Sequence, residues 1–78
     1  MPPLRDGAAA ARTLDRVATL VAAGVPPARA WALVGGFPDD AGPAWRDVSA
    51  VLRVAERTGA PSASTIRALA GALRRSAA

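Results

Sequence analysis

The chain has 78 residues, a net charge of +4, and neither cysteine nor histidine. A single domain of this size buries only about 60% of the surface that its unfolded chain exposes, and without cysteine no disulfide or thiolate metal site can stabilise it. The absence of histidine removes the commonest metal ligand and the usual general base, so side-chain packing or a partner must hold the fold together.

All ten basic residues are arginine, and alanine is abundant. A GC-rich coding bias is the favoured explanation, and selection of arginine for binding phosphate or carboxylate groups is the alternative. No apolar stretch approaches the roughly 18 residues that cross a bilayer, and no continuous hydrophobic segment follows Arg5 as it would in a secretory signal. These features predict a soluble, cytoplasmic chain.

The N-terminal segment 1–7 contains two prolines and a glycine, and we expect it to be flexible. Apolar residues then recur at helical spacing from about 8 to 23, which predicts an amphipathic helix. Gly24 ends this helix, and the two prolines that follow open a second one over 26–34. The expected contacts of these helices are Leu14, Val17, Ala18 and Val21 in the first, and Ala30, Trp31, Leu33 and Val34 in the second.

A loop is predicted over 37–42, and Pro43 begins a third helix that runs to about 58. Its apolar stripe is Trp45, Val48, Val51, Leu52 and Ala55. Gly59 closes it, and Ser62 can cap a fourth helix over 62–75, before a tail at 76–78. The fourth helix carries Ile66, Leu69, Ala70 and Leu73 on one side, and Arg74 and Arg75 in its last turn.

The turn after the first helix is repeated after the third, since residues 17–28 align with residues 52–63. Each copy is a helix, a tight turn and a helix. The sequence therefore predicts an all-α fold: a compact bundle of four helices made of two helical hairpins, in one domain over 8–75. The turn residues are Gly24, Pro26, Pro27, Gly59, Ala60 and Pro61. The predicted core is Leu14, Val17, Val21, Trp31, Val34, Trp45, Val48, Leu52, Ile66, Leu69 and Leu73.

The chain lacks the side chains of an enzyme. Its serines have no histidine to activate them, and it has neither a P-loop nor a dinucleotide-binding fingerprint, so we expect no catalytic residue and no cofactor. Asp39 and Asp40 are the only close pair of acidic residues. They could bind a hard cation together with backbone carbonyls, although a solvated loop before a helix is the favoured interpretation and no metal site is predicted.

Three arginines of the third helix, Arg46, Arg53 and Arg57, project within an arc of about 40°. They are a solvated face or a docking surface for an acidic partner. A small DNA-binding or regulatory adaptor of the helix-turn-helix kind is the alternative function. It is less favoured because the chain contains no Lys, Asn or Gln to read bases beside arginine.

The two turns carry a family resemblance. The segment 20–31, which reads LVAAGVPPARAW, resembles the "L-x-x-G-[LV]-P-x-x-x-A-[LW]" segment of the type II secretion system F domain. The segment 54–63, VAERTGAPSA, is similar to a second helix end of that family, and its composition is closest to actinobacterial TadB/TadC-like platform proteins of tight-adherence pili. The matching positions are Gly24, Pro26, Ala30, Gly59, Ala60 and Pro61, and the resemblance covers roughly 14–75.

The resemblance implies a non-enzymatic scaffold domain at the cytoplasmic face of the inner membrane. Its implied partners are the secretion or pilus assembly ATPase and other platform subunits, with a homo-oligomer as a further expectation. Membrane attachment would come through spans that this chain lacks, and the family usually continues into such a span from a helix end like Arg74-Arg75. The family domain commonly has more helices than the four predicted here.

Overall fold

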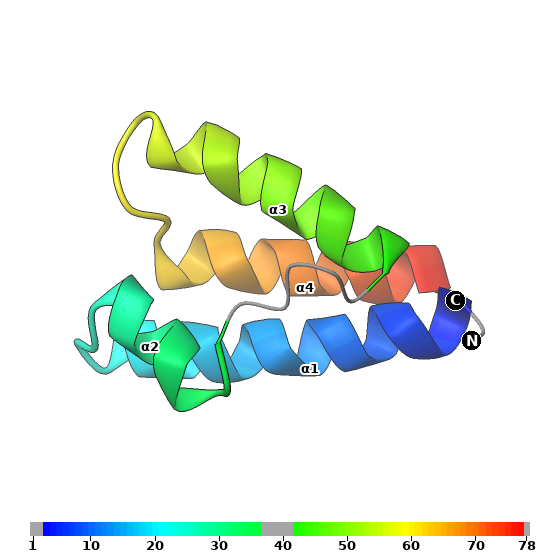
Figure 1. The fold of residues 1–78 in the computed structure, drawn as a ribbon, viewed down its shortest axis with the longest axis horizontal. Helices are drawn as coiled ribbons and strands as arrows, with labels where there is room; N and C mark the ends of the chain where they lie inside the picture. Colours follow the sequence, from blue (N-terminus) through cyan, green and yellow to red (C-terminus); the bar gives the residue numbers. More distant parts are fainter. Residues whose placement is uncertain (1–2, 37–41, 78) are drawn as a thin grey trace.

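A computed structural model describes the backbone of residues 3–36 and 42–77, and the side chains of residues 7–36 and 42–76. Its four helices are α1 (Pro3–Ala22), α2 (Pro27–Leu33), α3 (Pro43–Glu56) and α4 (Ala63–Ala77). No strand occurs within these ranges, and the predicted all-α bundle is confirmed (Figure 1). Asp39 and Asp40 lie outside the described residues.

The first helix begins earlier than the sequence suggested. It starts at Pro3 and not near residue 8, so residues 3–7 are helical where a flexible segment was expected. Proline is well tolerated in the first turn of a helix, and the alanines at 8–11 have the highest helix propensity. Gly7, which suggested a break, is buried within the helix. The other helix boundaries agree with the predicted ones to within two residues.

The main interface of the bundle joins the first and last helices. α1 and α4 lie side by side and antiparallel, with both chain ends at the same end of the bundle (Figure 1). Leu14 and Ala18 of α1 and Ile66 and Ala70 of α4 are buried. The two helices are also joined at their rim by an ion pair between Arg74 and Asp15, whose side chains are 49% and 39% exposed. At such exposure an ion pair contributes about 0–1 kcal/mol, so apolar packing dominates the interface.

The turn between α1 and α2 forms a complete helix-ending motif around Gly24. The N–H of Gly24 donates to the carbonyl of Val21 over 3.0 Å, and the N–H of Val25 donates to the carbonyl of Leu20 over 3.0 Å. These are the two hydrogen bonds of the Schellman motif, which needs a left-handed residue that glycine provides, and Gly24 has φ +100°. Val25 is partly buried against the core, so the turn is fixed by both hydrogen bonds and packing.

The turn between α3 and α4 is looser, although its glycine plays the same part. Gly59 has φ +132°, and its N–H donates to the carbonyl of Glu56 over 3.3 Å. Ala60, which aligns with Val25, is exposed and too small to anchor the chain. The predicted cap of α4 is confirmed, because the N–H of Thr65 donates to Ser62 Oγ over 3.2 Å.

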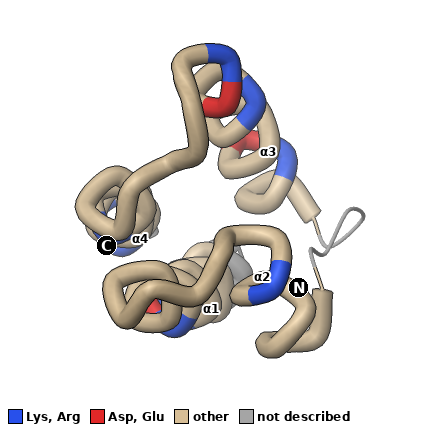
Figure 2. The backbone as a smooth tube through the Cα atoms, turned by 90° about the vertical axis from the view of Figure 1, so that its left-hand side faces the viewer, with Lys and Arg blue, Asp and Glu red and all other residues tan. Residues whose placement is uncertain are grey.

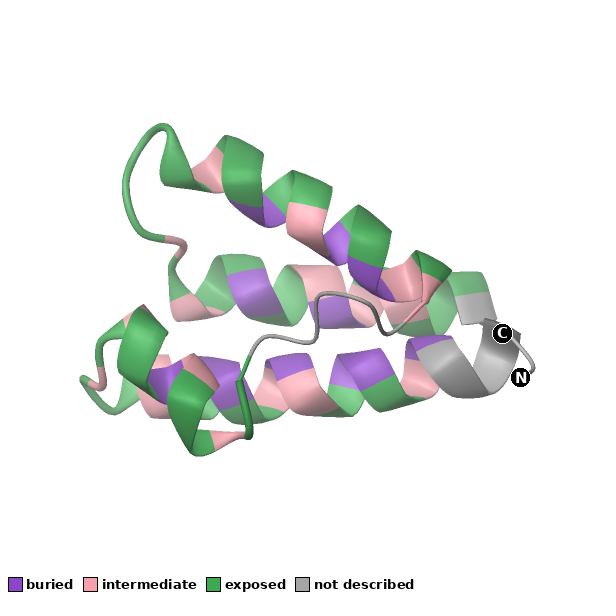
Figure 3. Ribbon diagram, in the orientation of Figure 1, coloured by how far each residue is buried: buried purple, intermediate pink, exposed green. Residues whose placement is uncertain are grey.

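The core contains every predicted residue, though not all are fully enclosed (Figure 3). Leu14, Val17, Trp45, Val48, Leu52 and Ile66 are buried, and Val21, Trp31, Val34, Leu69 and Leu73 are partly buried against them. Alanines make up much of the remainder, and they allow close approach of the helices. The fully buried ones are Ala10, Ala11, Ala18, Ala30 and Ala70, of which the first two were not anticipated.

Two glycine substitutions test the turn. We expect Gly24→Ala to destabilise the fold by about 1–2 kcal/mol, because an L-residue is strained in left-handed backbone; a Cβ there meets no atom within 4 Å, so strain alone is measured. Gly71→Ala is the matched control. It lies inside α4, where a Cβ would meet only Arg75 Nη1 at 3.3 Å, the end of a flexible side chain. It should stabilise the fold by about 0.5–1 kcal/mol. Urea unfolding monitored by circular dichroism measures the free energy of unfolding of both variants. Equal changes in the two variants would contradict a left-handed Gly24 in this turn.

A second pair of substitutions tests the α1–α4 interface. We expect Ala70→Leu to lower the free energy of unfolding by about 1–3 kcal/mol, because the fully buried site has no room for a larger side chain. Ala72→Leu, at an exposed position two residues along the same helix, should change it by less than about 0.5 kcal/mol. If thermal unfolding finds Ala70→Leu neutral, α1 and α4 do not pack through this alanine.

Candidate interaction surface

The third helix is held on the bundle by one side only. Pro43 stands at its first position, and Trp45, Val48 and Leu52 follow at spacings of three and four residues on its buried side. Such a stripe packs against one neighbouring surface and leaves the rest of the helix in water. α3 contacts α1, and its contacts with α4 are far fewer than those between α1 and α4.

A contact between the two tryptophans fixes the beginning of α3. The rings of Trp31 on α2 and Trp45 on α3 lie edge to face, with centroids 6.0 Å apart and planes at 72°. This geometry is the preferred one for aromatic pairs, and it adds about 0.5–1.5 kcal/mol beyond the area buried. Trp45 is only 6% exposed. The contact therefore joins the two helical hairpins.

α3 stands off α4. The first and last helices pack closely, and α3 contacts α1, whereas the view along the bundle in Figure 2 shows α3 apart from α4. Val51, which the sequence placed on the apolar stripe of this helix but not in the predicted core, is 45% exposed, since no neighbouring helix covers that side of α3. Val54, one turn further on, is 62% exposed.

An apolar strip lies on the uncovered side of α3. We call Ala50, Val51 and Val54 the α3 apolar strip; with Ala55 they line a shallow groove of about 400 Å³. The sequence did carry a signal for Val54. At 100° per residue it falls on the polar face of the predicted helix, opposite Leu52, where a large apolar residue has no reason to be buried.

The three predicted arginines are all exposed, Arg46 and Arg53 on α3 and Arg57 directly after its last residue. Arg46 and Arg53 line one groove together with Ser49 and Ala50. Arg57 is not among the residues that line it and follows the last residue of the helix. The structure therefore brings Arg46 and Arg53 to a common surface. Two acidic residues of the same helix, Asp47 and Glu56, are exposed as well, so α3 carries both signs of charge (Figure 2).

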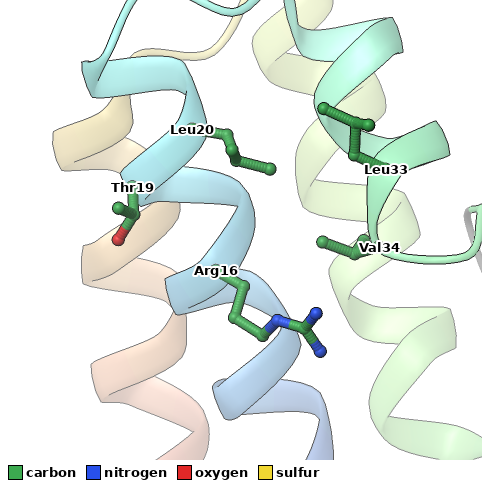
Figure 4. A pocket seen from close by; sticks show the side chains of 5 residues that line it. All are labelled: Arg16, Thr19, Leu20, Leu33 and Val34. Atoms are coloured by element: carbon green, nitrogen blue, oxygen red, sulfur yellow. The ribbon is translucent and has the colours of Figure 1, made fainter.

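A second groove lies between α1 and the end of α2. Leu20, Leu33 and Val34 extend into it, and the guanidinium of Arg16 lies at one end (Figure 4). The prediction that Leu33 is a packing contact of the second helix holds only in part, because Leu33 remains 56% exposed. The groove has a volume of about 430 Å³ and adds one more accessible apolar position to the surface.

The described residues contain no group of three or more His, Cys, Asp or Glu side chains that could hold a metal ion. No described helix combines the length and apolar character needed to cross a membrane. The described part of α3 presents exposed valines beside exposed arginines.

The chain matches no protein-family model, no curated protein and no solved structure.

An isosteric pair of substitutions tests which valines of α3 are buried. We expect Val48→Thr to destabilise the fold by about 1–3 kcal/mol, because it places a hydroxyl at a fully buried site. Val54→Thr should change the free energy of unfolding by less than about 0.5 kcal/mol, because its side chain already meets water. Denaturant titration of both variants measures the difference, and a comparable loss in Val54→Thr would mean that the α3 apolar strip is covered.

Proposed function

We propose that this chain is a non-enzymatic scaffold domain of a platform protein in a type II secretion or tight-adherence pilus system. It acts at the cytoplasmic face of the inner membrane and links the assembly ATPase to the membrane machinery. Spans outside this chain would attach it to the membrane, and other platform subunits are further partners.

The uncovered face of α3 carries this proposal. A scaffold needs a rigid body with an accessible surface, and exposed valines next to arginines are typical of the centre and rim of a protein interface. The specific family rests on the sequences around the two turns. In support, Gly24 and Gly59 end their helices with positive φ, as a glycine at such a turn requires.

Rigid-body transmission is the mechanism that suits such a domain. α1 and α4 form one packed pair, and α3 contacts α1 and is joined to α2 by the tryptophan contact. A force applied to α3 by the ATPase would be passed to this pair and on to the membrane part.

Direct binding tests the proposed function. The cognate secretion or pilus assembly ATPase should bind the purified chain in isothermal titration calorimetry. Changing Arg46, Arg53 and Arg57 together to Glu should weaken binding about tenfold or more, because exposed arginines steer and anchor an acidic partner. The matched control changes Arg12, Arg67 and Arg75 to Glu, which alters the net charge equally at exposed positions outside α3.

Two results would contradict the proposal. One is absence of any binding to the ATPase while the chain remains folded. The other is duplex DNA binding whose log K falls steeply as log salt concentration rises, which is the signature of phosphate contacts and would favour the DNA-binding adaptor.

A further inference from the structure

The arginines and the apolar strip of α3 form one continuous surface. The groove lined by Arg46 and Arg53 and the groove lined by Val51 and Val54 share Ala50. The helical wheel gives the same arrangement, because at 100° per residue Ala50 falls between the arginines and Val54. A single ligand lying along α3 would therefore meet a cationic edge and an apolar strip at once.

We propose that this surface binds one amphipathic helix of an acidic partner protein. The apolar stripe of that helix lies on the α3 apolar strip, and its carboxylates face Arg46 and Arg53, which can each hold a carboxylate through two parallel hydrogen bonds. This inference rests on the scaffold role proposed above and names the chemistry of the partner. α3 has 14 residues, so a partner helix of similar length covers the surface.

The position of Asp47 separates a protein partner from other anionic ligands. Asp47 is exposed four residues before Val51, so it lies next to the strip on the same side of the helix. A phospholipid surface or a nucleic acid would bring phosphates against this carboxylate, which is unfavourable. A protein helix avoids the clash by placing a basic side chain there, and that pairing also fixes its direction along α3.

Charge likewise disfavours a second copy of the chain. Each copy carries a net charge of +4. In an antiparallel two-fold pairing of α3 helices the same flank of each helix faces its partner, so the arginine edges would meet. An acidic helix has the complementary charge.

A pair of synthetic helices provides the probe. Both have the length of α3 and the same leucine stripe; the acidic peptide has Glu along one flank and Lys at one end, and the reversed peptide exchanges these charges. Fluorescence anisotropy with the full chain should show that the acidic peptide binds about tenfold tighter or more. The R46E/R53E variant should lose this preference, and V54T should weaken binding several-fold. The matched control R12E/R67E should change the affinity for the acidic peptide by less than about twofold.

Several outcomes would overturn the inference. The first is equal affinity for the two peptides, and the second is a loss of the preference for the acidic peptide in R12E/R67E as large as that in R46E/R53E. The third is tighter binding to phosphatidylglycerol vesicles or duplex DNA than to the acidic peptide. The fourth is a dimer, detected by sedimentation, that V54T dissociates. Circular dichroism verifies that each variant is folded. If the chain binds the ATPase and R46E/R53E binds it equally well, this inference is overturned and the proposed function stands. If the chain binds the acidic peptide but not the ATPase, the proposed function is overturned and this inference stands.

Discussion

The fold depends on the packing of α1 against α4, the two helices furthest apart in sequence. Fully buried alanines on both helices allow them to approach closely, and Leu14 and Ile66 fill the interface. This long-range contact has to offset the entropy of closing the chain between them. In a chain without disulfides, apolar packing of this kind is the principal stabilising term. The ion pair between Arg74 and Asp15 orients the helices but adds little because it is exposed.

The two similar turns have different structural consequences. At the first, Val25 packs onto the core and the complete pair of hydrogen bonds holds α2 close to α1. At the second, Ala60 provides no such anchor, and α3 stands off α4. One difference in side-chain size thus coincides with a closed first hairpin and an open second one. Val51, beside the buried stripe of α3, is exposed in this arrangement, and Val54 faces water because it lies opposite Leu52 on the helix.

The exposed face of α3 connects the fold to the proposed role. Exposed apolar side chains are tolerated in a small domain when they are few, and a cluster beside charged groups is typical of a binding site. The tryptophan contact joins the start of α3 to α2, and α3 also contacts α1, so the exposed face is held on the bundle at these contacts. A preorganised surface of this kind loses less entropy on binding than a flexible one does.

The helices, their turns and most of the core could be predicted from the order of the amino acids. Glycine and proline act locally, through allowed backbone angles and a missing N–H, so Gly24, Pro43 and Gly59 could be interpreted without a structure. Helical periodicity identified Leu14, Val48 and Ile66 in the same way. The start of α1 was missed because the prolines and glycine of segment 1–7 outweighed the alanines that follow. The pairing of α1 with α4 and the exposure of Val51 became apparent only from the three-dimensional arrangement of the helices. Periodicity predicts which face of a helix is apolar. How much of that face is covered depends on the tilt of the neighbouring helices. This tilt is set by packing between residues that are distant in sequence.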